Sequence, residues 1–291
     1  GLLWGVALLN YMDRQMLSTM KDAMMIDITE LESAANFGRL MADAATLFFI
    51  SIFGIVVKQH EAVFETAELA FSCAAFFGCC WALTRPYWGS ALAGFACGAS
   101  ILCSNLLVGA TVLVGCLMSH ILVRGIGDTS RKIFTTIAVA FVTFGLWPLV
   151  SYLLAGVVAG DYFNLWAQRQ IQIVGFFDPQ EILWFIKHFI WYLCPVWPFA
   201  FWAIWMWRKN LTVTHIALPL SFCFAWFVGF MLSSDVAAET LLSVTIAPLC
   251  VLATFGLMPC NRSTKSMLEL FSVAIFTLAL AGVWAYFIAW T

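Results

Sequence analysis

Charged residues that interrupt long apolar runs are the first candidates for chemistry in this sequence. Asp13 and Arg14 stand together at the end of the first apolar run, and Asp43 precedes fourteen uncharged residues. A charged side chain at membrane depth is costly, so such residues usually serve substrates, ions or protons. A carboxylate there can act as a general base when an acceptor hydroxyl comes within hydrogen-bond reach.

A second acidic group occupies one helical face. Glu61, Glu65 and Glu68 are spaced four and three residues apart, so they lie on the same side of a helix. We interpret this triad as a solvated face rather than a site.

Histidine and cysteine show no spacing typical of a metal or haem site. The ten cysteines form no C-x-x-C pair, and most lie inside apolar runs, where we interpret them as small buried hydrophobic residues. The four histidines show no ligand spacing. They are His60, His120, His188 and His215.

The composition indicates a membrane protein. Of the 291 residues, 63% are hydrophobic and 10% are charged, whereas a soluble domain has about a quarter charged residues. Apolar runs of about 20 residues match a hydrocarbon core of roughly 30 Å. We therefore predict an all-α, polytopic membrane protein with about 9–10 transmembrane helices. The sequence has no basic stripe that would indicate a nucleic acid as a partner. The predicted segments are 1–20, 41–57, 67–84, 88–103, 106–123, 133–157, 183–206, 212–232, 238–257 and 267–290.

Basic residues predict which connections face the cytoplasm. The connections around Arg131, Arg208 and Arg262 are basic, whereas 158–182 and 233–238 are acidic or neutral and are expected outside. The acidic segment 21–40 also reads as outside, so 41–57 should run inward to Lys58.

An even number of crossings is then needed before the basic loop 124–132, but three segments are available. One of them should be interfacial or re-entrant: either part of 88–123, which is broken at Ser104-Asn105, or 61–84.

Two local patterns predict packing and capping. Ser90, Gly94 and Gly98 are four residues apart, and small residues at that spacing allow helices to approach closely. In "FDPQEILWF", Asp178 reads as the N-cap of a helix that begins at Pro179 and follows a long outer loop.

From about Asp43 to the C-terminus, the sequence resembles the later part of a lipid-dependent membrane glycosyltransferase. The ordered stretches "MADAATLFF", "GSALAGFACGASILCSNLLVGATVLVG", "FNLWAQRQ" and "ILWFIKHFIWYLCPVWPFAFWAIW" carry the resemblance, together with "LSFCFAWFVGFMLSSDVAAETLLSVTIAPLCVLAT". The family is the GT-C type, which includes protein O-mannosyltransferases and aminoarabinose transferases. The resemblance implies transfer of a sugar from a polyprenyl-phosphate donor to a cell-envelope acceptor. It also implies that positive groups or a divalent metal stabilise the leaving phosphate.

The resemblance also implies site residues. Asp43 corresponds to an outer carboxylate and is the expected catalytic residue. The family usually has basic residues before the glutamate that aligns with Glu239, where this chain has Ala237 and Ala238, so phosphate binding is in doubt there. The expected substrate-binding residues are Trp166, Arg169, Glu239, Asn105 and His188.

The opening stretch resembles a different family. "NYMDRQMLSTMKDAMMIDITELESAANFGRLM" resembles the first helix and outer loop of a major facilitator superfamily transporter, over residues 4–42. That resemblance implies a role for Asp13 and Arg14 in a substrate path. We therefore expect a composite or a fragment, with a transporter-like part in 1–42 and an N-terminally truncated glycosyltransferase-like part in 43–291.

Three functions follow from these patterns. The first is a membrane glycosyltransferase, incomplete or inactive if its first catalytic loop is missing. The second is a secondary transporter, and the third is a non-catalytic membrane subunit. The short loops and the resemblance point to a bacterial inner membrane, with membrane lipids and a lipid-linked sugar as partners.

Overall fold

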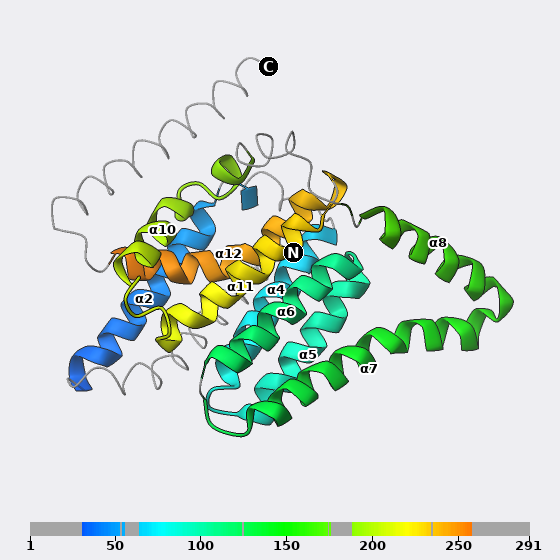
Figure 1. Ribbon diagram of the computed structural model, residues 1–291, viewed down its shortest axis with the longest axis horizontal. Helices are drawn as coiled ribbons and strands as arrows, with labels where there is room; N and C mark the ends of the chain where they lie inside the picture. The colour runs from blue at the N-terminus through cyan, green and yellow to red at the C-terminus, as the bar shows by residue number, and fades with distance from the viewer. Residues whose placement is uncertain are drawn as a thin grey trace, which may run out of the picture.

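The described part of the chain is a bundle of α-helices. The computed structural model describes residues 31–52, 54–55, 64–123, 125–173, 175, 188–233 and 235–257, and no strand occurs in these ranges. The all-α prediction is confirmed for them (Figure 1). The helices are α2 (Leu31–Ser51), α4 (Phe64–Trp81), α5 (Pro86–Cys103), α6 (Leu106–Leu122), α7 (Thr129–Ala155), α8 (Val157–Ile173), α10 (Val196–Met206), α11 (Thr214–Met231) and α12 (Asp235–Leu257).

Close backbone approach joins α5 to α7, as the small-residue pattern predicts. A Cβ on Gly94 would meet the Thr136 carbonyl oxygen of α7, and one on Gly98 would lie 2.7 Å from the Ala140 carbonyl oxygen. Ser90 is fully buried. The prediction that Ser90, Gly94 and Gly98 form a packing face is confirmed, because larger side chains at the two glycines would push the helices apart.

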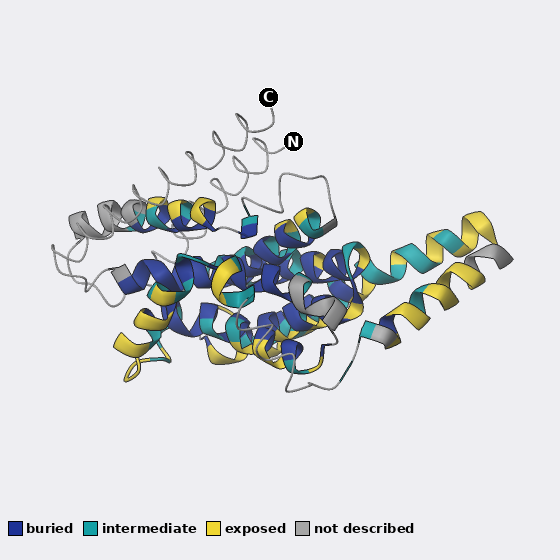
Figure 2. Ribbon diagram, turned by 90° about the horizontal axis from the view of Figure 1, so that it is seen from above, coloured by how far each residue is buried: buried dark blue, intermediate teal, exposed yellow. Residues whose placement is uncertain are grey.

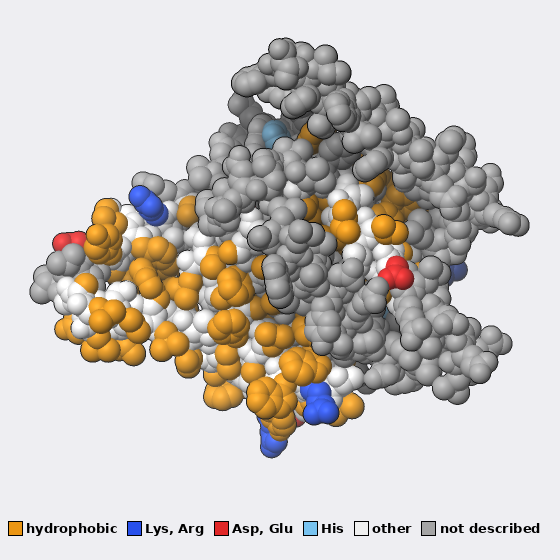
Figure 3. Space-filling view, turned by 180° about the vertical axis from the view of Figure 1, so that it is seen from behind, with side chains coloured by type: hydrophobic (Ala, Val, Ile, Leu, Met, Phe, Trp, Pro, Cys, Tyr) orange, Lys and Arg blue, Asp and Glu red, His pale blue; other side chains and the backbone are white. Residues whose placement is uncertain are grey.

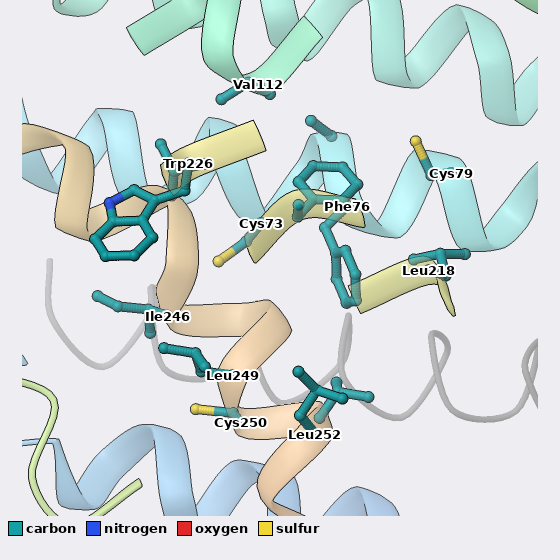
Figure 4. Close-up of a cluster of buried hydrophobic side chains, with 14 of the residues drawn as sticks. Cys73, Phe76, Cys79, Val112, Leu218, Trp226, Ile246, Leu249, Cys250 and Leu252 are labelled. Carbon is teal, nitrogen blue, oxygen red and sulfur yellow. The ribbon is translucent and has the colours of Figure 1, made fainter. Parts of the chain in front are cut away.

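The core lies where α4, α6, α11 and α12 meet. Phe76 of α4 packs edge-on against Phe222 of α11, with ring centroids 5.2 Å apart. Figure 4 shows apolar side chains from these helices converging on one cluster, with Cys73, Cys79 and Cys250 among them. Those cysteines are buried, which agrees with their interpretation as small hydrophobic residues.

The bundle has two chemically different ends. At the first, which we call the basic end, the turns 82–85 and 123–128 meet through a hydrogen bond from the Ile126 N–H to the Leu83 carbonyl. The second, which we call the polar end, holds the junction between α5 and α6 and the start of α12. Helix α11 runs antiparallel to α6, because Ser221 contacts Gly115 and Gly229 contacts Thr111. Residues 207–213, which precede α11 and carry Arg208, therefore also lie toward the basic end.

Both segments that flank the Ser104-Asn105 break are full-length helices. Helices α5 and α6 have 18 and 17 residues, which is about 27 Å and 26 Å of rise. The chain does break at this point, as the sequence predicts. Helix α4 also has 18 residues, and a half-crossing in either 88–123 or 61–84 stays a prediction.

The packing of α2 fixes its direction relative to the segment 188–206. Phe48 packs against Phe199, with ring centroids 5.4 Å apart, and Gly54 lies against the Tyr192 ring. Helix α2 therefore runs antiparallel to the segment 188–206, which follows the connection that we expected outside. The inward direction of 41–57 and the outside position of 158–182 therefore do not both hold, because the two predictions together require α2 and the segment 188–206 to run the same way. The number of crossings between 58 and 123 stays a prediction.

A helical arm projects from the bundle. The first half of α7 packs on α5, whereas its second half and α8 extend away together, as Figures 1 and 2 show. Leu153 and Leu154 at the end of α7 are 72% and 82% exposed. The expectation of a long loop over 158–182 is wrong for 158–173, because these residues are helical. Asp178, the expected cap, lies outside the described residues.

Two of the described helices are long and apolar enough to cross a membrane. They are Thr129–Ala155 and Thr214–Met231, with mean hydropathies of 2.0 and 1.5. Most of the first is not covered by other helices, whereas the second is largely buried in the bundle. The predicted segments 1–20 and 267–290 lie outside the described residues.

Candidate functional site

A buried carboxyl group at the polar end is the main chemical feature of the described residues. Glu68 of α4 has an exposed fraction of 0%, and the Ser243 hydroxyl of α12 donates a hydrogen bond to its Oε1 atom. Glu68 Oε2 has no hydrogen-bond partner in the part of the chain that the structure describes. A buried polar atom without a partner costs free energy, so this oxygen is available to a ligand or a proton.

The hydroxyl of Ser243 has two possible acceptors. It lies 2.5 Å from Glu68 Oε1 and 2.7 Å from the Thr240 carbonyl oxygen. A hydroxyl group donates one hydrogen only. When Glu68 is ionised, the Ser243 hydroxyl can donate that hydrogen to the carboxylate. When Glu68 is protonated, the hydroxyl can donate to the Thr240 carbonyl and accept a hydrogen bond from the carboxyl group. The pair can thus take up or release a proton at Glu68 while Ser243 keeps a hydrogen bond.

The junction between α5 and α6 lies next to this carboxyl. Asn105 caps α6, because its Oδ1 accepts from the Val108 N–H at 2.8 Å. Its Nδ2 donates to the Ser104 hydroxyl at 3.2 Å. The Ser104 side chain in turn lies next to the Glu68 carboxyl. Asn105 thus has a local structural role that also fixes Ser104 beside the carboxyl.

Helix α8 is tied to the same end. Gln170 is buried, and its Oε1 accepts from the Leu106 N–H at 2.7 Å, which satisfies a donor in the first turn of α6. A little further on, the Gly175 N–H donates to the Leu232 carbonyl, at the end of α11. The end of α8, the α5–α6 junction, the start of α4 and the start of α12 therefore converge around Glu68.

The structure places Asp43 elsewhere. It lies within α2, twelve residues after the first residue of that helix, and its side chain is exposed. The expectation that Asp43 stands at the mouth of a helix beginning at Met41 is wrong, because the helix already begins at Leu31. The segment 31–42 is rich in residues that favour helix, including Leu, Ala, Glu and Met, so nothing ends the helix before Asp43.

Two expected substrate-binding residues lie on α8. Trp166 is half-buried in an aromatic cluster with Phe144, Trp147 and Phe163, with ring centroids 5.7, 5.9 and 5.8 Å away. Its ring therefore holds α8 against α7. Arg169 is exposed and precedes the anchored Gln170, so its guanidinium extends from the turn that reaches the polar end.

The other expected site residues are described only in part. His188 is half-buried at the start of the segment that leads to α10, where it makes an interaction with a neighbour. Glu239 belongs to α12, one turn before Ser243, but its side chain lies outside the described residues. Asp13 and Arg14 also lie outside them.

A metal site is not formed by the described residues. Among them, no group of three or more His, Cys, Asp or Glu side chains has an arrangement that could hold a metal ion. Oxygen atoms of Glu68, Ser104 and Ser243 do gather at the polar end, but they include one carboxyl group only.

Glu68 is the functional candidate that the sequence interpretation misses. The triad of Glu61, Glu65 and Glu68 was expected to form a solvated face, yet Glu68 is fully buried and Glu65 is half-buried. The signal that separates them is local. Glu68 is followed by the apolar run Leu69-Ala70-Phe71, so it already lies inside the apolar segment, where an ionisable residue is usually functional.

Comparison with known proteins gives no relative for this chain. No protein-family model matches it, and searches of curated proteins and of solved structures return no significant match.

Proposed function

We propose that the protein is a polytopic membrane protein that transfers a sugar from a polyprenyl-phosphate donor to a cell-envelope acceptor, as GT-C glycosyltransferases do. The observation that carries the proposal is the buried Glu68 carboxyl, whose Oε2 has no hydrogen-bond partner among the described residues. It lies where the starts of α4, α6 and α12 and the end of α8 meet. The stretches that carry the sequence resemblance supply three of these four elements. The two membrane-length helices support the placement in a bilayer.

The chemistry assigned to this end is a displacement at the sugar. The acceptor hydroxyl oxygen bonds to the anomeric carbon, the bond from that carbon to the phosphate oxygen breaks, and polyprenyl phosphate leaves with the electron pair. Glu68 takes the acceptor proton, a role that its hydrogen bond with Ser243 accommodates in both protonation states. Arg169 is the cation that we assign to the leaving phosphate.

Asp43 is the competing candidate for the base, because the sequence resemblance points to it. Its exposed position within α2 places it on a different surface from the Glu68 pair. The two carboxylates are therefore tested against each other.

The test is sugar transfer by the full chain in liposomes, with a labelled polyprenyl-phosphate sugar and an envelope lipid fraction as acceptor. Glu68→Gln should lower the transfer rate about 10²- to 10⁴-fold, the usual contribution of a general base. Asp43→Asn and the matched control Glu65→Gln, one helical turn from Glu68, should leave it within about twofold. Loss of transfer in Asp43→Asn with full activity in Glu68→Gln would move the base to Asp43.

A proton-coupled transporter is the second candidate, and the same carboxyl favours it. A fully buried glutamate in a membrane bundle is also what a proton relay uses. Substrate-driven acidification in vesicles that is lost in Glu68→Gln, together with absence of transfer in the liposome assay, would favour transport. Absence of both activities in the intact chain would favour a non-catalytic membrane subunit.

A further inference from the structure

A hollow at the basic end, far from Glu68, is the second site that the structure offers. It lies between the start of α5 and the start of α7 and has a volume of about 470 Å³. Its lining combines one cation, hydroxyl groups and aromatic rings. The lining residues are Tyr87, Ser130, Arg131, Phe134 and Thr135.

The polar groups of this hollow favour an anion with several oxygen atoms. The Arg131 guanidinium donates to the Tyr87 hydroxyl at 3.5 Å, which turns both groups toward the same space. The Ser130 hydroxyl lies in the first turn of α7, where backbone N–H groups also favour negative charge. A phosphate group can accept from a guanidinium and from hydroxyl groups at once, and arginine suits it through its paired N–H donors.

One acidic group opposes an anion here. Asp128 Oδ2 lies 3.9 Å from the Arg131 Nε atom, and the two side chains are 59% and 71% exposed. An exposed pair at this separation is weak and is screened by salt, so it competes with a phosphate without excluding it. Asp128 also caps α7 through the Ser130 N–H at 3.2 Å, which explains its presence by local structure.

The rim of the hollow identifies the source of the phosphate. Tyr87, Trp88 and Phe134 are 58%, 69% and 73% exposed, and Phe141 continues the apolar surface along α7. Figure 3 shows basic side chains beside hydrophobic ones at the lower edge of one face, below a broad hydrophobic surface. Exposed aromatic rings beside a basic residue, at the end of an apolar helix, are typical of the headgroup level of a bilayer. A free phosphate ion would make no favourable contact with this apolar rim, whereas the glycerol and acyl groups of a lipid would.

We propose that the hollow between Tyr87 and Arg131 binds the phosphate of an anionic phospholipid, with the acyl chains lying along the exposed apolar surface of α7. The proposal rests on the membrane placement made under the proposed function, but not on sugar transfer. Arg131 supplies the charge, Tyr87 and Ser130 supply hydroxyl donors, and the rings hold the glycerol region. The site would anchor the basic end at the cytoplasmic leaflet, whose lipids are anionic.

The experiment measures lipid binding by the full chain purified in neutral detergent, with short-chain phosphatidylglycerol as the probe and phosphatidylcholine as the uncharged comparison. Arg131→Gln should weaken phosphatidylglycerol binding roughly fivefold, the usual effect of one arginine near an anionic surface. Lys209→Gln is the matched control, because Lys209 is an exposed cation in the segment 207–213, toward the same end of the bundle, but does not line the hollow. It should leave the affinity unchanged.

Two further measurements test the competing charge of Asp128 and distinguish a lipid phosphate from free phosphate. Asp128→Asn retains a good helix cap and removes the competing charge, so it should tighten phosphatidylglycerol binding. Inorganic phosphate at the concentration of the lipid should not displace it. Equal weakening in Arg131→Gln and Lys209→Gln, or displacement by inorganic phosphate, would overturn the proposal. The assay contains no sugar donor, and membrane fractionation reports insertion separately, so a failure of sugar transfer is distinguishable from a failure here.

Discussion

The bond between Ser243 and Glu68 gives the sharpest test of the polar end. Ser243→Ala removes the hydrogen-bond partner of Glu68 Oε1, and Oε2 has none among the described residues, so Ser104 is the polar side chain left beside the buried carboxyl. Leaving a buried polar group unpaired costs about 1–3 kcal/mol, and more when the group is charged. We therefore expect a loss of about 2–3 kcal/mol in unfolding free energy, which is roughly 3–5 °C in melting temperature for a chain of this size.

The matched control is Ser72→Ala on the neighbouring turn of α4. Ser72 is also buried, but its hydroxyl donates only to the Leu69 carbonyl of its own helix, at 3.0 Å. Its removal should cost less than about 1 kcal/mol, because the carbonyl can keep its helical partner. The double variant Glu68→Met with Ser243→Ala should regain the lost stability, since replacing both partners by apolar groups of similar shape is nearly neutral.

The assay is thermal unfolding of the full chain in one detergent, followed by circular dichroism, with all four proteins prepared alike. The reasoning fails if Ser243→Ala costs no more than Ser72→Ala. It also fails if adding Glu68→Met leaves the double variant as unstable as Ser243→Ala alone, because the cost would then not come from the unpaired carboxyl.

Three further predictions concern packing. Gly98→Val should lower the unfolding free energy by at least about 1–3 kcal/mol in thermal unfolding, because the new side chain would meet Thr143 and the Ala140 carbonyl. The control Gly145→Ala, at a position with open space, should be neutral or stabilising. Asn105→Ala should cost about 1 kcal/mol in the same measurement through loss of the α6 cap, and Asn105→Ser should recover most of it. Trp166→Ala should speed proteolysis within α8, because its contacts with three rings of the arm are lost; an unchanged cleavage rate would contradict that role.

The helices were largely predictable, because apolar runs and their breaks are local signals. The segments 106–123 and 212–232 coincide with α6 and α11 to within two residues. The direction of α2 was not predictable, because it depends on the contact of Phe48 with Phe199, residues separated by half of the chain. The helical state of 158–173 was missed for a related reason: its polar residues indicate a loop, whereas Trp166 and Gln170 anchor it as a helix against α7 and α6.

The site was less predictable than the fold, because its main residue is defined by what covers it. Spacing places Glu61, Glu65 and Glu68 on one face, but spacing cannot tell which member of a face is covered by another helix. Ser243 lies 175 residues further along the chain and is one of many serines in apolar surroundings. Asn105, by contrast, was selected at a visible helix break, and the structure gives it a definite partner in Val108.

The two ends of the bundle differ in charge: one has exposed arginines and the other has a buried carboxyl group. This difference links the fold to the proposed function. At the basic end, Arg131 and Arg208 are exposed, where a negatively charged leaflet would attract them. At the polar end, Glu68 is buried and accepts a hydrogen bond from Ser243 of α12. Under the membrane placement that we propose, short basic loops would be retained on the cytoplasmic side, and Glu68 would then face the outer side. A lipid-linked donor and an envelope acceptor would meet there, so the orientation and the position of the carboxyl support one another without either being assumed from the other.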